Sequence, residues 1–475
     1  MGVVERFLLF LQLVIDKNQV NMNYILKAVL VLLVLSVSPN LWAQSTKWRD
    51  IHKVKRHETI FGIARSYDLT IEELLDANPE MKEKGYELKK GSEIFIPYSK
   101  TSTTQPTPAK PSKPTTTAKG IDVVKVGIML PFLDNSTEGK RMIEYYRGVR
   151  AALDSLGHMG IKTQVNLWNL NKDSVVTNVL KHNPQIANQD VIFGPLYTNQ
   201  VHPLADFCHK HGARLVIPFS TTATDVNSNP NIFQIYQDED ELSARSRGAF
   251  VERFSHSHRP IFINCNNPSD GKYTFTRSLR EYLESKNIQA EITDINTPLR
   301  EFAKHFSQTQ PNVVILNSAA YKPLERVFEK LDSLKNIDPS LIISTYGYNE
   351  WFIYQPYLEK DYFKYNVHIP TTFYYSRKSA RTEVFEKLFE KDYGQKMNPD
   401  GLPRMGIMGF DHTMYFVLGL SHYGEKYVGN EQQNSEYKPL QTRLEFKKLK
   451  DGGYQNNNFQ VIRFKTDGSV DSLTY

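Results

Sequence analysis

The stretch VKVGIMLPF (124–132) decides the fold of the larger part of this 475-residue chain. It is a continuous apolar run rich in β-branched residues, which is typical of a strand buried on both faces of a parallel sheet. Similar runs recur downstream, separated by helical sequence: VIFGPLY (191–197), RLVIPFS (214–220), PIFINC (260–265), NVVILNS (312–318), SLIISTY (340–346) and VHIPTTFYY (367–375). Strands that alternate with helices predict a doubly wound α/β fold. Because the strands are too many for one such sheet, we expect two lobes.

A second, smaller pattern occupies residues 51–97. Two short runs place apolar residues at helical spacing: Ile60, Ile63 and Ala64, then Ile71, Leu74 and Leu75. Thr70, with Glu73 three residues later, forms a capping box at the start of the second helix. Asn78-Pro79 ends that helix, because the residue before a proline avoids helical geometry. With an extended segment on either side, this region is predicted to be a compact βααβ unit.

Charge is unevenly placed along the chain. The formal net charge is +6, yet residues 100–119 alone carry four lysines and no acidic residue. A nucleic-acid-binding surface needs a basic face on a folded module, so we expect no nucleic-acid partner. The segment 100–120 is rich in Pro, Thr and Lys and cannot form a core, which predicts a linker able to extend over roughly 60 Å.

Residues 1–43 have the layout of an export signal. Lys27 precedes the apolar run Ala28–Val37, and Ala43 is the expected cleavage point. The run is shorter than the roughly 20 residues that a membrane-spanning helix needs, and a membrane-anchoring helix is the alternative. Met22 is then the expected start of translation, and no cysteine follows the run to carry a lipid. We expect a periplasmic or cell-wall-associated protein with no stable membrane anchor after signal cleavage.

The run HKVKRHETIFGIARSYDLTIEELLDANP (52–79), followed by LKKGSEIFIP (88–97), resembles a LysM domain. That family binds N-acetylglucosamine-containing glycans, such as peptidoglycan, in a groove between the loop before the first helix and the loop after the second. The resemblance implies glycan contacts at Glu58, Thr59, Ile60, Asn78, Pro79 and Glu80. The chain departs from the family in having His57-Glu58 where Gly-Asp is usual. Thr59 and Asn78 are also ordinary helix-end residues.

From about residue 121 to the end, the chain resembles the type I periplasmic binding proteins, in particular the receptors for branched-chain amino acids. The resemblance rests on an ordered set of motifs: VKVGIMLPF (124–132), FGPLYT (193–198), IPFSTTAT (217–224), IFQIYQDEDELSARSRGAF (232–250) and GFDHTMYFVLGL (409–420). It implies a small solute, an amino acid or a peptide-like molecule, held in a cleft between two lobes that close by a hinge motion.

The same resemblance implies ligand contacts just after the strands of both lobes. The matching positions are Tyr197, Thr198, Ser220, Thr221, Thr222, Asn267, Tyr346 and Asn349. Glu350 is the candidate for the acidic residue that the family usually places in the second lobe. Ser, Thr and Asn after strands are also ordinary caps and turn formers, so a purely structural role is the alternative.

Four segments follow from these patterns: a signal region at 1–43, a LysM domain at 48–99, a linker at 100–120 and a two-lobed domain at 121–475. Lobe 1 is expected at about 121–247 and 367–430. Lobe 2 is expected at about 248–366 and 431–475.

A second resemblance indicates a different role. Gly194-Pro195-Leu196, with Val201, Leu204 and the strand LVIPFS (215–220), is similar to the outer-membrane activators of penicillin-binding proteins. Those proteins use the same fold to contact other proteins in cell-wall synthesis. We favour an exported, non-enzymatic envelope protein that binds peptidoglycan and a small solute, as in amino acid transport. The alternative is a peptidoglycan-tethered regulator that contacts cell-wall synthesis enzymes.

The sequence offers no motif for catalysis, for a cofactor or for a metal. It has no Gly-x-Ser-x-Gly, Gly-Lys-Ser/Thr or His-Glu-x-x-His pattern. His209 and His211 lie two residues apart, so on a helix they point to different faces. We therefore expect no enzyme, with a wall hydrolase as the remote alternative. Cys208 and Cys265 are expected to be buried free thiols, and a bridge between them would require their elements to adjoin.

Overall fold

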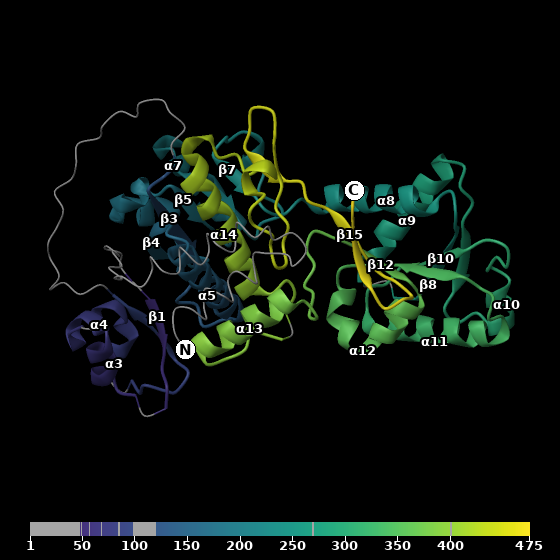
Figure 1. The fold of residues 1–475 in the computed structure, drawn as a ribbon, viewed down its shortest axis with the longest axis horizontal. Helices are drawn as coiled ribbons and strands as arrows, with labels where there is room; N and C mark the ends of the chain where they lie inside the picture. The colour runs from purple at the N-terminus through teal and green to yellow at the C-terminus, as the bar shows by residue number, and fades with distance from the viewer. Residues whose placement is uncertain are drawn as a thin grey trace, which may run out of the picture.

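The computed structural model describes residues 48, 50–56, 58–67, 69–83, 86–97, 120–267, 270–399 and 401–475. The expected export signal lies outside these residues, as does the expected linker apart from Gly120. The described chain forms a small amino-terminal domain and two α/β lobes (Figure 1). Within these ranges, no helix combines the length and the apolar character needed to cross a membrane.

The amino-terminal domain is the predicted βααβ unit. Its elements are β1 (Asp50–Lys53), α3 (Ile60–Ser66), α4 (Ile71–Ala77) and β2 (Glu93–Ile96). The two strands pair antiparallel. The capping box is confirmed: the Glu73 amide donates to Thr70 Oγ1 over 3.1 Å, and the Thr70 amide donates to Glu73 Oε2 over 2.8 Å. These local signals fix the start of α4 independently of the rest of the chain.

Lobe 1 is built on a seven-stranded sheet in the order β13-β14-β7-β6-β5-β3-β4. Its strands are β3 (Val123–Leu130), β4 (Lys162–Asn169), β5 (Val191–Phe193), β6 (Arg214–Ile217), β7 (Ile232–Gln234), β13 (Phe446–Lys448) and β14 (Tyr454–Asn456). Its main helices are α5 (Thr137–His158), α6 (Val176–His182), α7 (Val201–His211), α13 (Ala380–Tyr393) and α14 (Met405–Tyr423). The opening prediction is confirmed: Ile128 and Met129 of β3 are both fully buried and belong to different core clusters.

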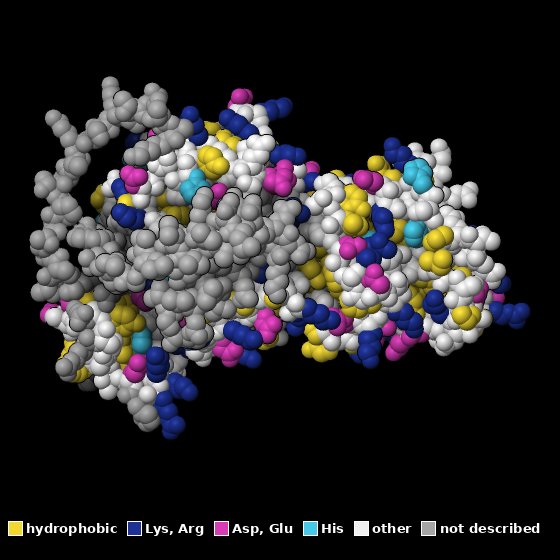
Figure 2. Space-filling model, in the orientation of Figure 1, with side chains coloured by type: hydrophobic (Ala, Val, Ile, Leu, Met, Phe, Trp, Pro, Cys, Tyr) yellow, Lys and Arg dark blue, Asp and Glu magenta, His cyan; other side chains and the backbone are white. Residues whose placement is uncertain are grey.

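Lobe 2 has a second seven-stranded sheet, in the order β16-β15-β12-β11-β10-β8-β9. Its strands are β8 (Arg259–Asn264), β9 (Glu291–Asp294), β10 (Asn312–Leu316), β11 (Ile343–Tyr346), β12 (Val367–Thr371), β15 (Gln460–Phe464) and β16 (Val470–Thr474). Its helices are α8 (Glu239–Phe254), α9 (Lys272–Ser285), α10 (Leu299–Ala303), α11 (Tyr321–Ile337) and α12 (Trp351–Lys364). Basic and acidic side chains are interspersed on its visible face (Figure 2).

All three expected lobe boundaries are wrong. Residues 239–247 were expected in lobe 1, but they belong to α8, which packs in a core cluster of lobe 2. Residues 367–371 were expected in lobe 1, but β12 pairs parallel with β11 and lies in the lobe 2 sheet. Residues 446–456 were expected in lobe 2, but β14 pairs parallel with β7 and carries β13 at the edge of the lobe 1 sheet. The two strands at that edge are three residues long and largely polar, so they lack the apolar run by which β3, β5 and β6 of the same sheet were found.

The chain crosses between the lobes three times, after β7, after β12 and between β14 and β15. Side-chain amides tie the crossings together. Gln237 Nε2 donates to the Asn456 carbonyl over 2.8 Å, and Asn458 Nδ2 donates to the Thr372 carbonyl over 3.2 Å. These bonds hold the three crossing segments together at the junction of the lobes. A short junction of several segments is the kind of element about which two lobes can rotate.

Helices α5 and α14 pack closely in lobe 1. A Cβ built on Gly148 of α5 would lie 1.8 Å from the Gly406 carbonyl oxygen. A Cβ built on Gly409 of α14 would lie 2.0 Å from the Tyr145 carbonyl oxygen. Real Cβ atoms do not approach backbone this closely, so the contact requires glycine on both helices. The contact joins the start of α14 to the middle of α5 and fixes how the two helices pack.

Candidate functional site

A cavity of about 510 Å³ lies between the lobes. Lobe 1 lines it with residues that follow β5, β6 and β7 and with the start of α5, and lobe 2 lines it with residues that follow β11 and β12. The carboxyl ends of parallel strands are the usual place for a ligand in sheets of this type. The volume falls in the roughly 300–1,000 Å³ range of small-molecule sites.

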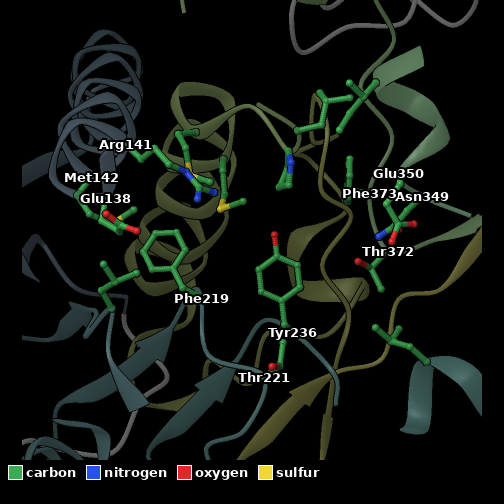
Figure 3. A pocket seen from close by; sticks show the side chains of 17 residues that line it. Glu138, Arg141, Met142, Phe219, Thr221, Tyr236, Asn349, Glu350, Thr372 and Phe373 are labelled. Atoms are coloured by element: carbon green, nitrogen blue, oxygen red, sulfur yellow. The ribbon is translucent and has the colours of Figure 1, made fainter. Parts of the chain in front are cut away.

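Most of the lining is apolar. The apolar side chains are Met142, Leu196, Phe219, Leu242, Ile353, Phe373, Leu402, Pro403, Met405 and Met408. Polar and charged side chains stand among them, in the arrangement seen in Figure 3: Glu138, Arg141, Thr221, Tyr236, Asn349, Glu350 and Thr372. Such a lining suits a molecule with an apolar body and a few polar groups.

Arg141 and Tyr236 supply hydrogen-bond donors from lobe 1. Arg141 lies in the second turn of α5, and Tyr236 follows β7 with its hydroxyl directed into the cavity (Figure 3). Among the described residues, the Arg141 guanidinium has no ion-pair or hydrogen-bond partner. Burial raises the pKa of Tyr236, and Arg141 only partly opposes that rise. The phenol therefore stays protonated at neutral pH, and the two groups together can bind a carboxylate.

Glu350 brings a carboxylate to the cavity from lobe 2. Its Oε1 pairs with Lys272 Nζ over 2.6 Å. Its Oε2 is buried and has no hydrogen-bond partner in the described part of the chain. A buried oxygen without a partner costs free energy that a donor group on a ligand would recover. Asn349, next to it, is exposed and lines the same cavity.

Three of the hydroxyls predicted to contact a ligand bond to one another. Thr198 Oγ1 lies 2.8 Å from Ser220 Oγ and 3.1 Å from Thr222 Oγ1. Ser220 Oγ also accepts the Ala223 amide over 3.2 Å. These three residues do not line the cavity, whereas Thr221, within the same turn, does. Thr198, Ser220 and Thr222 therefore fit the alternative given above, in which such residues stabilise a turn.

The other predicted positions divide between the cavity and the interior. The prediction that Tyr346 contacts a ligand is wrong. Its side chain is 1% exposed, and its hydroxyl donates to the Ser246 carbonyl over 2.8 Å inside lobe 2. Asn267 Nδ2 donates to Ser318 Oγ over 3.4 Å, away from the cavity lining. Tyr197 is half-buried and also outside the lining. Of the eight predicted positions, only Thr221 and Asn349 line the cavity.

Sequence reasoning missed Arg141, Tyr236, Glu138 and Thr372. Tyr236 and Thr372 lie just after β7 and β12, in the segments that cross between the lobes, so the rule that ligands lie beyond strand ends could have found them. Arg141 and Glu138 lie on α5 rather than after a strand. Their orientation depends on how α5 packs against α14, which no local pattern reveals.

In the LysM-like domain, the side chains predicted to contact glycan differ in their exposure to solvent. Thr59, Pro79 and Glu80 are exposed, and Ile60 is half-buried. Asn78 is fully buried.

The Asn78 side chain is wholly engaged inside the domain. Its Nδ2 donates to the carbonyls of Leu74 and Phe95 over 2.8 and 2.7 Å, and its Oδ1 accepts the Phe95 amide over 2.7 Å. The amide thus ties α4 to β2, and it cannot also contact a glycan. Glu58 Oε2 accepts the Lys55 amide over 2.6 Å and lies 2.8 Å from His52 Nε2. Burial favours the neutral carboxyl, but these bonds prevail and lower the pKa of Glu58.

The described residues contain no group of three or more His, Cys, Asp or Glu side chains placed to hold a metal ion. Cys208 and Cys265 are both buried free thiols, as predicted. Burial raises the pKa of each thiol to about 12, so neither is an activated nucleophile.

Comparison with known proteins agrees with this architecture. Residues 52–97 match the model of the LysM domain family. A branched-chain amino acid ABC transporter structure from Rhodospirillum rubrum aligns with 74% of this chain and 100% of its own, at 12% identity and a TM-score of 0.50. An ABC transporter substrate-binding protein of Desulfitobacterium hafniense in complex with Leu covers the same shares at 13% identity and a TM-score of 0.39.

LpoA of Haemophilus influenzae aligns with 75% of this chain and 60% of its own, at 15% identity and a TM-score of 0.46. A search among curated proteins finds no match. At these identities the structural likeness concerns the fold alone. Residues 52–97 are a LysM domain, and the two lobes that follow have the fold of the type I periplasmic binding proteins.

Proposed function

We propose that this chain is an exported, non-enzymatic envelope protein that binds peptidoglycan through its LysM domain and a small amino-acid-like or peptide-like solute between its lobes. One observation supports the proposed solute binding. Opposite charges, Arg141 on lobe 1 and Glu350 on lobe 2, face one largely apolar cavity (Figure 3). A zwitterion with an apolar side chain matches both charges and the lining between them.

The arrangement also gives a reason for the lobes to close. A ligand whose carboxylate binds Arg141 and Tyr236, and whose ammonium binds Glu350, makes contacts to both lobes only when they are together. Differential affinity of this kind shifts the hinge toward the closed form. The exposed Glu138 at the start of α5 offers the ammonium a second carboxylate.

The proposed solute binding can be tested by a thermal-shift screen of residues 48–475 against amino acids, short peptides and muropeptides. A ligand at 100 times its Kd stabilises the folded state by about 2.7 kcal/mol, which raises the melting temperature by a few degrees. A specific hit is expected. If no compound raises the melting temperature of well-folded protein, the proposed solute binding is contradicted.

Co-sedimentation with insoluble peptidoglycan tests the proposed glycan binding by the LysM domain. The double variant Pro79→Ala with Glu80→Ala changes two exposed side chains in the expected groove, so we expect less protein in the pellet. Glu87→Ala, an exposed LysM position outside the two groove loops, is the matched control and should sediment like the wild type. Equal sedimentation of all three proteins would contradict this placement of the groove.

The second candidate, a regulator that contacts a cell-wall synthesis protein, is favoured by one feature of lobe 2. Helix α12 exposes Tyr357 at 77%, and Tyr321 packs edge-on against Tyr357 with ring centroids 6.3 Å apart. Exposed apolar surface of this kind is typical of protein contacts. A flat solute screen, together with a defined partner whose binding is lost in Tyr357→Ser, would favour this candidate.

A further inference from the structure

The two-stranded sheet of the LysM domain has two apolar faces. Ile94 and Ile96 of β2 belong to the domain's own core, beneath α3 and α4. The opposite face carries Ile51, Lys53, Glu93 and Phe95, since Ile51 pairs with Phe95 and Lys53 pairs with Glu93 across the strands.

Side chains on this second face are buried although the helices of the LysM domain lie on the other side. Phe95 is 3% exposed and Ile51 is 9% exposed. Trp48 packs on Phe95 with ring centroids 4.5 Å apart. Something outside the βααβ unit must therefore cover the face.

Lobe 1 provides the cover. Trp48, Ile51 and Phe95 belong to one continuous hydrophobic cluster with residues of lobe 1, including Tyr146 of α5 and Met397 beyond α13. Figure 1 shows β1 beside α5, at the end of the molecule away from lobe 2.

Charged and polar contacts frame this apolar patch. Arg147 of α5, whose side chain is 5% exposed, forms an ion pair with Glu93. Lys53 Nζ donates to Gln395 Oε1, just after α13. The ion pair fixes the orientation of the LysM domain because either charge, left buried without the other, would be costly.

We propose that the LysM domain works docked on lobe 1, through the sheet face of Ile51, Lys53, Glu93 and Phe95, rather than as a free module at the end of a spacer. The exposed groove residues Thr59, Pro79 and Glu80 are outside the contacts described for this face, so a docked domain can still bind glycan. A glycan held there fixes lobe 1 relative to the polymer and leaves lobe 2 as the moving lobe. The docking itself does not depend on the proposed solute.

Chemical cross-linking tests the docking directly. In the chain 48–475 carrying Lys53→Cys and Gln395→Cys, a short bis-maleimide should join the two positions at least about tenfold faster than in the control pair Glu72→Cys and Gln395→Cys. Glu72 is exposed in the first turn of α4 and belongs to neither β1 nor β2. The native cysteines are buried and do not compete. Equal rates for the two pairs would overturn the proposal.

A charge exchange tests the same contact in another way. Adding Arg147→Glu to the Lys53→Cys and Gln395→Cys chain should slow cross-linking, and adding Glu93→Arg as well should restore it. Glu93→Gln, a milder change on the LysM side, should slow it even if Arg147→Glu impairs folding, which circular dichroism would reveal. Unchanged rates in folded Glu93→Gln protein would contradict the docked arrangement. No solute or glycan is present in these assays, so their outcome is separate from that of the proposed function.

Discussion

Asp411 in the interior of lobe 1 and the polar groups of the cavity between the lobes differ in whether the chain itself satisfies them. Asp411 of α14 is fully buried and accepts four hydrogen bonds, from the Tyr437 hydroxyl at 2.6 Å and from the amides of Leu440, Gln441 and Thr442 at 2.8–2.9 Å. In the cavity, Arg141 and Glu350 Oε2 have no such partners among the described residues. A polar group that is fully satisfied by its own chain holds the fold together. A polar group left open in a cavity is available to a ligand.

The largest effect is expected at Asp411. Asp411→Ala leaves the Tyr437 hydroxyl and three backbone amides buried without an acceptor, and should cost about 3–5 kcal/mol of unfolding free energy. Urea unfolding followed by circular dichroism measures it. A loss below about 1 kcal/mol would mean that this network is not what holds residues 437–442 to α14.

Acid should destabilise the interior through two buried histidines. Burial lowers the pKa of His412 and of His368 to about 3. An unfolded histidine has a pKa of about 6.5, so between pH 6.5 and 3 the unfolded chain binds more protons, and stability falls as the pH falls.

Each of these histidines should contribute a slope of about 1.4 kcal/mol per pH unit in that window. His412→Phe removes one of them, so its unfolding free energy should depend less steeply on pH between 6 and 4 than that of the wild type. Urea unfolding at several pH values gives both slopes. Parallel curves for the two proteins would contradict a neutral buried His412.

The packing of α5 on α14 predicts opposite outcomes at two glycines of one helix. Gly148→Ala places a Cβ against the Gly406 carbonyl and should destabilise by about 1–3 kcal/mol. Gly157→Ala meets nothing within 4 Å and should stabilise by up to about 1 kcal/mol through helix propensity. Thermal unfolding of both variants checks the contrast. A Gly148→Ala variant at least as stable as the wild type would show that the close crossing does not require glycine.

The smallest effect on stability is expected in the cavity. Arg141→Gln removes an exposed guanidinium without a partner, so the unfolding free energy should change by less than about 0.5 kcal/mol. Affinity for a carboxylate-bearing ligand should nevertheless fall at least about tenfold. Denaturation and binding measured on one preparation separate the two properties. A large loss of stability would indicate that Arg141 stabilises the fold rather than binding a ligand.

The sequence predicted those parts of the fold that local pattern controls. Apolar runs located β3, β5, β6, β8, β10, β11 and β12, and the capping box located α4. The edge strands β13 and β14 were missed because they are short and polar. They belong to the lobe 1 sheet only because β14 pairs with β7, more than 200 residues away in sequence, and β13 pairs with β14.

The candidate site was only partly predictable for a related reason. The resemblance to periplasmic binding proteins implied contacts just after strands, and two of those positions, Thr221 and Asn349, line the cavity. Tyr346 ends β11 in the same way, but its side chain points toward α8 and packs edge-on against Phe250 with ring centroids 5.2 Å apart. Which face of the sheet a terminal side chain takes, and which face of α5 meets the cavity, are decided by tertiary packing.

The most direct test of the central claim is a calorimetric titration of residues 48–475 with the best ligand from the thermal-shift screen and with its amide. The amide keeps the apolar body and removes only the negative charge. If Arg141 and Tyr236 hold a carboxylate in the cavity, the amide should bind at least about tenfold more weakly, a difference of about 1.4 kcal/mol. Equal affinity for acid and amide, or the same ratio in Arg141→Gln, would contradict the account.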